Sequence, residues 1–118
     1  MDARLIGAYG EVYTARFLRC NGYDIIQANY RCRMGEIDII ASDGKYVCFV
    51  EVKTRDENAV YSAKEAVDIA KQRKIIATAS FYLSNNKTKL QPRFDVAEVY
   101  MKDGEAVDFK YIKNAYNS

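Results

Sequence analysis

Apolar residues near the start of the chain recur at helical spacing. Between residues 2 and 20 they fall on one stripe, which comprises Leu5, Ala8, Tyr9, Val12 and Ala15. This spacing predicts an amphipathic helix that Asp2 can cap and that Asn21-Gly22 brings to an end. Gly7 and Gly10 lie inside the predicted helix, although a glycine costs a helix about 1 kcal/mol relative to alanine. We therefore expect their bare backbone to allow close approach of another element or a ligand.

The rest of the chain predicts strands interrupted by a second helix. Residues 23–31, 37–40, 46–53, 93–100 and 106–112 are rich in β-branched and aromatic residues, with turn signals between them. A capping box at Ser62-Ala63-Lys64-Glu65 starts a stretch of helical spacing that runs out near Leu83-Ser84-Asn85-Asn86. This helix joins two strands, so they are expected to be parallel neighbours in a right-handed crossover.

Composition limits the chain to one domain. With 118 residues, 49% of them hydrophobic, residues 1–118 can bury one core but not two. The predicted fold class is α/β, a mixed β-sheet flanked by helices in the order α-β-β-β-α-β-β. The formal net charge of +2 allows a nucleic-acid partner without requiring one. Three cysteines without a C-x-x-C pair indicate reduced thiols, and no long apolar run is present, so we expect a cytoplasmic protein with no membrane partner.

Two short acidic motifs flank a predicted hairpin turn. Gly35-Glu36-Ile37-Asp38 precedes the Asp-Gly turn signal at residues 43–44, and Glu51-Val52-Lys53 follows it. If Asp43 and Gly44 are the two central turn residues, Asp38 faces Phe49 and is a diagonal neighbour of Glu51. Lys53 then lies on the same face, because side chains alternate along a strand. A loop with an odd number of residues would place Asp38 on the other face.

Paired carboxylates at this spacing favour a bound cation. At about 4 Å two carboxylates repel each other by about 1 kcal/mol in water and about 4 kcal/mol at an effective dielectric near 20. Lys53 can offset one charge, whereas a divalent ion such as Mg²⁺ or Mn²⁺ suits a cluster of hard oxygen ligands better. The alternative is an exposed, salt-bridged strand end. The chain has no histidine, which excludes a histidine general base and a histidine-ligated zinc site.

Several motifs in order resemble a known family. They are Gly7-x-x-Gly10-Glu11, Asn29-Tyr30-Arg31, Gly35-Glu36-Ile37-Asp38, Phe49-Val50-Glu51-Val52-Lys53-x-Arg55, Lys71-Gln72-Arg73-Lys74 and Arg93-Phe94-Asp95-Val96. Together they resemble the bacterial YraN-like family, a small branch of the PD-(D/E)XK nuclease superfamily that is similar to archaeal Holliday junction resolvases. The resemblance covers nearly the whole chain. It implies a restriction-endonuclease-like core and a metal-dependent endonuclease acting on nucleic acid, most readily DNA, including branched DNA.

The resemblance also assigns roles to residues. It makes Asp38 and Glu51 metal ligands with the carbonyl of Val52, and gives Lys53 the task of orienting or deprotonating water or stabilising the phosphorane. Glu11 matches an acidic residue on the first helix that completes the metal site. The proline that often precedes the superfamily's aspartate is replaced here by Ile37.

Contacts to nucleic acid are expected around this site. Arg31, Arg33 and Arg55 flank the acidic motifs, and Lys71 lies on the second helix, so all four can meet phosphates. Related nucleases often carry a glutamine or lysine after the E-x-K strand, a place that Gln72 takes. The resemblance also allows a homodimer. A non-catalytic nucleic-acid-binding or assembly module with the same fold is the alternative function, and the sequence leaves DNA or RNA open.

Overall fold

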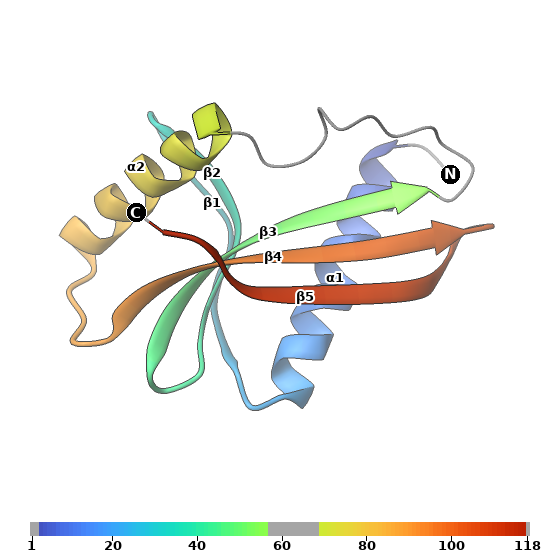
Figure 1. The fold of residues 1–118 in the computed structure, drawn as a ribbon, viewed down its shortest axis with the longest axis horizontal. Coiled ribbons are helices and arrows are strands. Elements are labelled where there is room, and N and C mark those ends of the chain that lie inside the picture. Colours follow the sequence, from blue (N-terminus) through green and yellow to red (C-terminus); the bar gives the residue numbers. More distant parts are fainter. Residues whose placement is uncertain (1–2, 57–68, 118) are drawn as a thin grey trace.

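A five-stranded mixed sheet with one helix on each face forms the molecule (Figure 1). The computed structural model describes residues 3–56 and 69–117. The elements follow the predicted order: α1 (Ala3–Cys20), β1 (Asp24–Cys32), β2 (Gly35–Ser42), β3 (Tyr46–Asp56), α2 (Ile69–Asn85), β4 (Gln91–Lys102) and β5 (Glu105–Tyr116). The α/β class and the element order predicted from the sequence are confirmed. The predicted capping box at residues 62–65 lies outside the described residues.

The strands lie in the sheet in the order in which they occur along the chain. β3 and β4 pair in parallel, and the other three neighbouring pairs are antiparallel. The helix α2 belongs to the connection between the two parallel strands, as expected, because parallel neighbours need a long crossover. Consequently the carboxyl ends of β3 and β4 lie at the same edge of the sheet.

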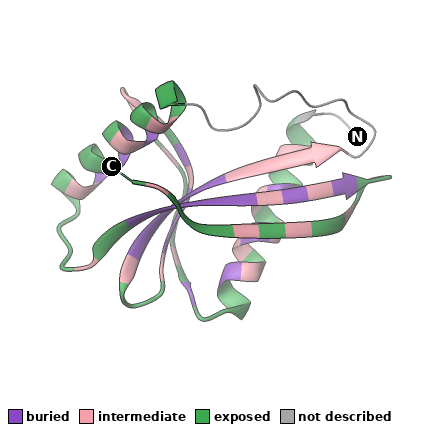
Figure 2. Ribbon diagram, viewed as in Figure 1, coloured by how far each residue is buried: buried purple, intermediate pink, exposed green. Residues whose placement is uncertain are grey.

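The two helices cover opposite faces. On one face Ile75, Ala79 and Tyr82 of α2 pack against alternate residues of β2, β3 and β4. On the other face Leu18 of α1 packs against the intervening residues, among them Val50. Both faces of β3 and β4 are therefore buried, and buried residues concentrate in the centre of the sheet (Figure 2). This arrangement explains why residues 47–50 form one continuous apolar run rather than an alternating one.

Gly10 brings α1 close to β3. A Cβ at Gly10 would overlap with Thr54 Oγ1 and would lie 3.2 Å from Thr54 Cβ, so only glycine fits there. The expected close approach of another element is confirmed for Gly10, whereas a Cβ at Gly7 would meet nothing within 4 Å among the described residues. The predicted stop is also confirmed, because Gly22 has φ +84° and Tyr23 N donates to the carbonyl of Leu18 at 3.0 Å.

The β2–β3 hairpin differs from the prediction in its register. Ser42 pairs with Val47 and Ile40 with Phe49, so Asp38 does not face Phe49. The connection is longer than two residues because the Asp43 carboxylate accepts hydrogen bonds from Lys45 N at 2.9 Å and Tyr46 N at 2.7 Å. Such an Asx-type turn replaces the tight Asp-Gly turn. The register moves by two residues, which preserves the parity of the ladder as far as Ile39. Beyond Ile39 the alternation of β2 is interrupted, because Ile37 and Ile40 both pack on the α2 face, so Asp38 and Glu51 do not share one regular strand face as predicted.

A buried polar network joins β4 to β5 and to the turns. Arg93 donates through Nε and Nη2 to the fully buried Asp95, with contacts of 2.8–3.2 Å. Asp95 also accepts hydrogen bonds from Tyr111 Oη at 2.6 Å and Asn114 N at 2.9 Å. Burial raises the pKa of Tyr111 well above its usual value. Arg93 and Asp95 therefore form a structural pair on the α1 face, whereas Phe94 between them packs on the α2 face.

Neither helix in the described part of the chain is long and apolar enough to cross a membrane.

Candidate active site

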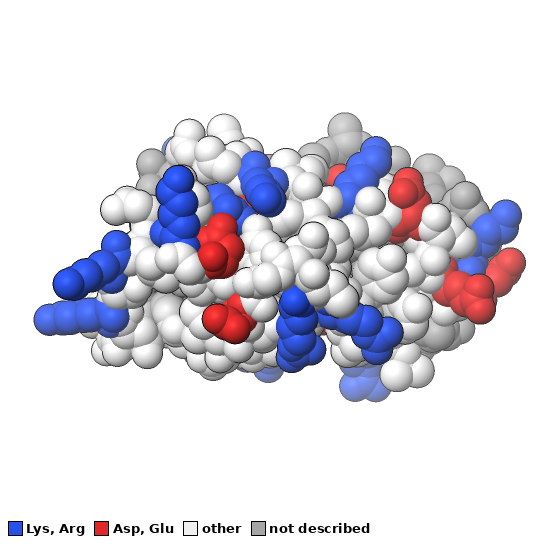
Figure 3. Space-filling model, turned by 90° about the horizontal axis from the view of Figure 1, so that it is seen from below, with Lys and Arg blue, Asp and Glu red and all other residues white. Residues whose placement is uncertain are grey.

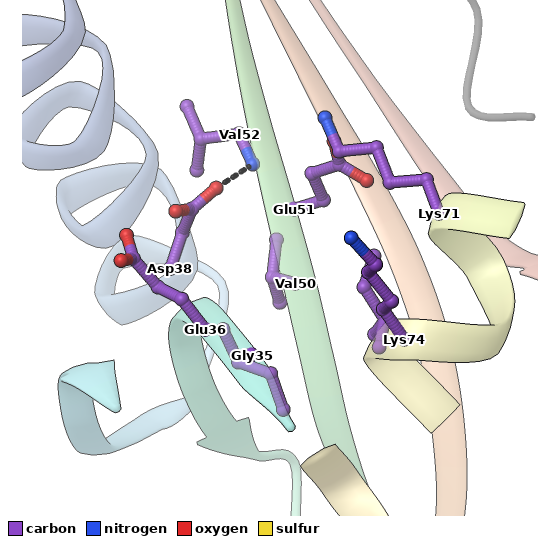
Figure 4. A pocket seen from close by; sticks show the side chains of 10 residues that line it. Gly35, Glu36, Asp38, Val50, Glu51, Val52, Lys71 and Lys74 are labelled. Carbon is purple, nitrogen blue, oxygen red and sulfur yellow. Dashed lines mark hydrogen bonds and ion pairs between the residues drawn. The ribbon is translucent and has the colours of Figure 1, made fainter. Parts of the chain in front are cut away.

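A pocket of about 410 Å³ opens between the start of β2, the middle of β3 and the first turns of α2 (Figure 4). This volume falls in the range of small-ligand sites. Its walls combine carboxylates, lysines and apolar side chains: Gly35, Glu36, Ile37, Asp38, Val50, Glu51, Val52, Lys71, Lys74 and Ile75. Both carboxylates of the predicted pair, Asp38 and Glu51, line it.

The pocket exists because β2 and β3 separate at this point. Their ladder ends at the pair Ile39–Val50, and the next residue on β2 is Asp38. Instead of a backbone carbonyl, Asp38 Oδ2 accepts the hydrogen bond from Val52 N, at 2.8 Å. Because the N–H and C=O of one extended residue point to the same side of a strand, the carbonyl of Val52 also faces this gap. Asp38 and the Val52 carbonyl therefore share this gap, whereas the Glu51 carboxylate is turned toward Lys71 of α2 (Figure 4).

Asp38 is held in an unfavourable environment for a negative charge. Burial is the main cause that raises its pKa to about 6, and the nearby charges of Glu11, Glu51 and Glu36 raise it further. The hydrogen bond from Val52 N works in the opposite direction, because it stabilises the ionised form. A carboxylate with these neighbours gains from a cation placed beside it.

Glu51 is the buried member of the pair. Its Oε1 lies 2.6 Å from Lys71 Nζ, and the side chain of Glu51 is 9% exposed against 56% for Lys71. Its Oε2 is buried and has no hydrogen-bond partner within residues 3–56 and 69–117. An unpaired buried carboxylate oxygen is costly, so this atom is a candidate ligand for a cation.

Glu11 lies on α1 near Asp38, outside the lining of the pocket. Its charge raises the pKa of Asp38, which places it close to that carboxylate. Its own pKa is raised, chiefly by burial and also by Glu36, while a hydrogen bond with the side chain of Asn29 lowers it. The contact at Gly10 fixes the height of α1 on β3, and therefore the position of the next residue, Glu11.

Lys53 lies beside the pocket rather than in it. It lines a neighbouring cavity of about 220 Å³, together with Arg55 and Gln72 and with Val96, Glu98, Ile112, Ala115 and Tyr116. Burial lowers the pKa of Lys53, and the negative charge of Glu51 raises it in part. The charge of Glu51, which lines the larger pocket, therefore acts on the amine of Lys53 in the neighbouring cavity.

The arginines predicted to bind nucleic acid are placed differently from one another. Arg55 Nε pairs with Glu98 at 3.2 Å inside the smaller cavity. Arg31 Nε pairs with Glu36 at 2.9 Å on an exposed surface, where the two side chains are 73% and 44% exposed. Arg33 is exposed between β1 and β2. Neither Arg31 nor Arg33 lines either cavity.

The residues present fit a divalent cation. Asp38, Glu51 and the Val52 carbonyl are hard oxygen donors, and Glu51 Oε2 is a buried acceptor with no hydrogen-bond partner in the described parts of the chain. No group of three His, Cys, Asp or Glu side chains in that part converges closely enough to hold a metal by side chains alone. The site accordingly depends on two carboxylates and the backbone, with Glu11 close by.

Three further residues shape the site, and the sequence had indicated only Lys74 among them, as a possible phosphate contact. Asn29 hydrogen bonds to Glu11 from a backbone conformation with φ +53° on β1. Lys74 lines the pocket one turn after Lys71, and Gly35 lies so close to α2 that a Cβ would be 2.9 Å from Thr78 Oγ1. All three occur inside motifs that carry the family resemblance, but their positions next to the carboxylates follow from the packing of α1 and α2.

Comparison with known proteins identifies the family. The model of the uncharacterised protein family UPF0102 matches residues 10–99, which hold every candidate site residue. The chain belongs to this family. This agrees with the YraN-like resemblance of its motifs.

Close relatives cover almost the whole chain. A UPF0102 protein of Caldicellulosiruptor saccharolyticus is 42% identical over 118 residues, which cover 98% of this chain and 100% of the relative. One from Acetivibrio thermocellus is 44% identical over 121 residues, covering 98% and 93%. One from Clostridium botulinum is 41% identical over 114 residues, covering 94% and 93%. The family has a domain of this length.

Proposed function

We propose that this UPF0102 member is a metal-dependent endonuclease of the PD-(D/E)XK type that hydrolyses phosphodiester bonds in nucleic acid, with DNA as the preferred substrate. The observation that carries the proposal is the pocket where β2 and β3 separate. Asp38 and Glu51 both line it, Asp38 with a pKa raised to about 6 and Glu51 with a buried oxygen that lacks a partner among the described residues. A module that only binds nucleic acid has no physical need for such a cluster, because buried carboxylates repel phosphate.

Asp38, Glu51 and the Val52 carbonyl would hold Mg²⁺ or Mn²⁺, with Glu11 completing the site directly or through water. The ion supplies positive charge that activates water and offsets the negative charge on the phosphorane. The protein's own part is to keep these oxygens in place before the ion arrives. The hydrogen bond from Val52 N to Asp38 does this for one ligand.

Lys53 has the properties required of a group beside the reacting phosphate. Its lowered pKa makes its proton easier to exchange than that of an exposed lysine. In hydrolysis the water oxygen forms a bond to phosphorus, the bond to the leaving oxygen breaks, and one water proton is lost while the leaving oxygen gains one. In our proposal Lys53 orients the water or stabilises the phosphorane by donating to its oxygen.

Nucleic acid would approach from the α2 side. Lys71 and Lys74 line the pocket, and Lys53, Arg55 and Gln72 line the adjoining cavity, so positive side chains follow one path across both. Elsewhere Lys and Arg alternate with Asp and Glu and form no continuous basic face in the view of Figure 3. A localised basic path suits contact with a few phosphates near the cleaved bond.

Cleavage assays test the proposal directly. Labelled linear, flap and four-way DNA, and single-stranded RNA, are incubated with the protein and Mg²⁺ or Mn²⁺. We expect cleavage of DNA that Asp38→Asn and Glu51→Gln each reduce by about 100-fold or more, because each removes a ligand charge from the metal site.

Matched controls distinguish an effect of the pocket carboxylates on activity from the effect of removing any negative charge. Asp24→Asn and Glu105→Gln make the same changes at exposed positions on β1 and β5 and should retain activity. If the wild type binds DNA without cutting any substrate, the non-catalytic binding module takes the place of the endonuclease. If the pocket variants cut as well as the wild type, Asp38 and Glu51 are not the active site.

A further inference from the structure

The two oxygens of Glu51 have different environments. Oε1 is paired with the ammonium of Lys71 at 2.6 Å, and Oε2 is buried with no hydrogen-bond partner among the described residues. Glu51 lies at the floor of the pocket on β3, and Lys71 reaches it from the first turns of α2 (Figure 4). The ion pair therefore spans the mouth of the pocket, from an exposed lysine to a buried carboxylate.

A divalent ion bound to Glu51 would compete with the ammonium group of Lys71 for the same carboxylate. Mg²⁺ binds oxygen at about 2.1 Å, and Lys71 Nζ lies 2.6 Å from the other oxygen of the same carboxylate. The two positive groups would be within about 7 Å of each other on the same carboxylate, so each weakens the binding of the other.

The structure indicates which group can move. Lys71 is 56% exposed and has a long, flexible side chain, whereas Glu51 is 9% exposed and fixed in the centre of the sheet. Lys74 lies one turn further along α2 and also lines the pocket. It carries the same charge, but the structure gives it no ion pair with Glu51.

We propose that Lys71 is the resident counter-cation of Glu51 and is displaced from it when a divalent ion binds. The inference rests on the proposed function, because it concerns the same metal site. In the metal-free protein the ammonium compensates a buried carboxylate that would otherwise be destabilising. Divalent ions must then break this pair, so Lys71 lowers the affinity of the site and sets the ion concentration at which it fills.

Metal titration of matched variants tests this exchange. The probe is Mn²⁺ alone, measured by calorimetry on the full chain. We expect Lys71→Met to bind Mn²⁺ about tenfold more tightly than the wild type, the scale of one hydrogen bond to a charged group. Lys74→Met should change the affinity by less than about threefold, because it removes the same charge without a bond to Glu51.

Thermal unfolding supplies a second readout that does not depend on activity. Without metal, Lys71→Met should melt below the wild type, because Glu51 loses its partner, yet it should gain more from added Mn²⁺. Lys71→Arg retains a cation at the same place and should stay close to the wild type in both measurements. This variant also keeps the test informative if Lys71→Met does not fold.

The outcomes distinguish this inference from the proposed function. If Lys71→Met binds Mn²⁺ no more tightly than Lys74→Met, the exchange is overturned while the metal site stands. If Mn²⁺ binds the wild type and Glu51→Gln equally well, the ion does not use Glu51, which overturns both. A wild type that binds no Mn²⁺ contradicts the metal dependence of the proposed function, and the exchange with it.

Discussion

At the scale of single residues, the ionisation of Asp38 couples the pocket to the stability of the fold. Its pKa rises from 3.8 to about 6 on folding, mainly because the carboxyl is buried. The folded chain therefore holds the proton more tightly than the unfolded chain. The stabilisation from protonation is fully present below about pH 4 and is lost as the pH rises through 6. At neutral pH the ionised carboxylate carries a cost that the metal-free protein has to bear.

Asp38→Asn should remove this cost. The amide is neutral at every pH, and its oxygen can still accept the hydrogen bond from Val52 N. We expect the variant to be more stable than the wild type at neutral pH by up to about 3 kcal/mol. This advantage should shrink as the pH falls toward 4. Urea denaturation with a chelator present measures the difference at each pH.

Asp24→Asn is the control, because it makes the same change at an exposed position. An advantage of Asp38→Asn that is absent at neutral pH, or that grows on acidification, would contradict the assignment. The gain in stability should accompany a loss of cleavage, as expected where binding groups are held in an unfavourable state.

At the scale of elements, the approach of α1 to β3 at Gly10 determines where Glu11 lies. Gly10→Ala should destabilise the protein by about 1–3 kcal/mol, because the new methyl group overlaps with Thr54 and forces the helix outward. Gly7→Ala should instead be neutral or stabilising by up to about 1 kcal/mol, because a Cβ there meets nothing and alanine favours the helix. Chemical denaturation of the two variants measures the contrast.

Thr54→Ala in the Gly10→Ala background should recover part of the loss, because the overlapping hydroxyl is removed. Equal stability of the Gly7→Ala and Gly10→Ala variants would mean that the close contact does not constrain α1.

The helices and strands also show which parts of the fold the sequence patterns could predict. Helical spacing and the Asn21-Gly22 stop defined α1, and the alternating runs defined the strands, because these signals are local. The hairpin register was wrong by two residues, since the Asp43 carboxylate bonds to the backbone of Lys45 and Tyr46 and lengthens the connection. The sequence displayed the aspartate but could not indicate which of two turns it would make.

At the scale of the whole molecule, the Arg93–Asp95 pair connects parts that are distant in the chain. Arg93 donates to Tyr23 Oη at 2.8 Å and to Asp43 at 3.4 Å, besides its contacts with Asp95. Asp95 is bound in turn by Tyr111 and Asn114 of β5. The α1–β1 connection, the β2–β3 turn, β4 and β5 thus meet at one buried ion pair.

Asp95→Asn should therefore destabilise the fold by about 3–5 kcal/mol, because it leaves the Arg93 charge buried without an equal partner. Arg31→Gln, which breaks the exposed pair with Glu36, should cost less than about 1 kcal/mol. The free energy of unfolding in urea measures both. A loss below 1 kcal/mol for Asp95→Asn would show that the network is not required for stability.

The sequence by itself determined the α/β class, the order of elements and the residue types of the site, because periodicity, turn signals and motif spacing are properties of neighbouring residues. Only the tertiary structure decided that β2 and β3 separate at Asp38, that Lys53 and Gln72 line a second cavity, and that Lys71 pairs with Glu51. These facts depend on how α1 and α2 pack on opposite faces of the sheet. Such packing joins residues with no regular separation along the chain, so local patterns do not specify it.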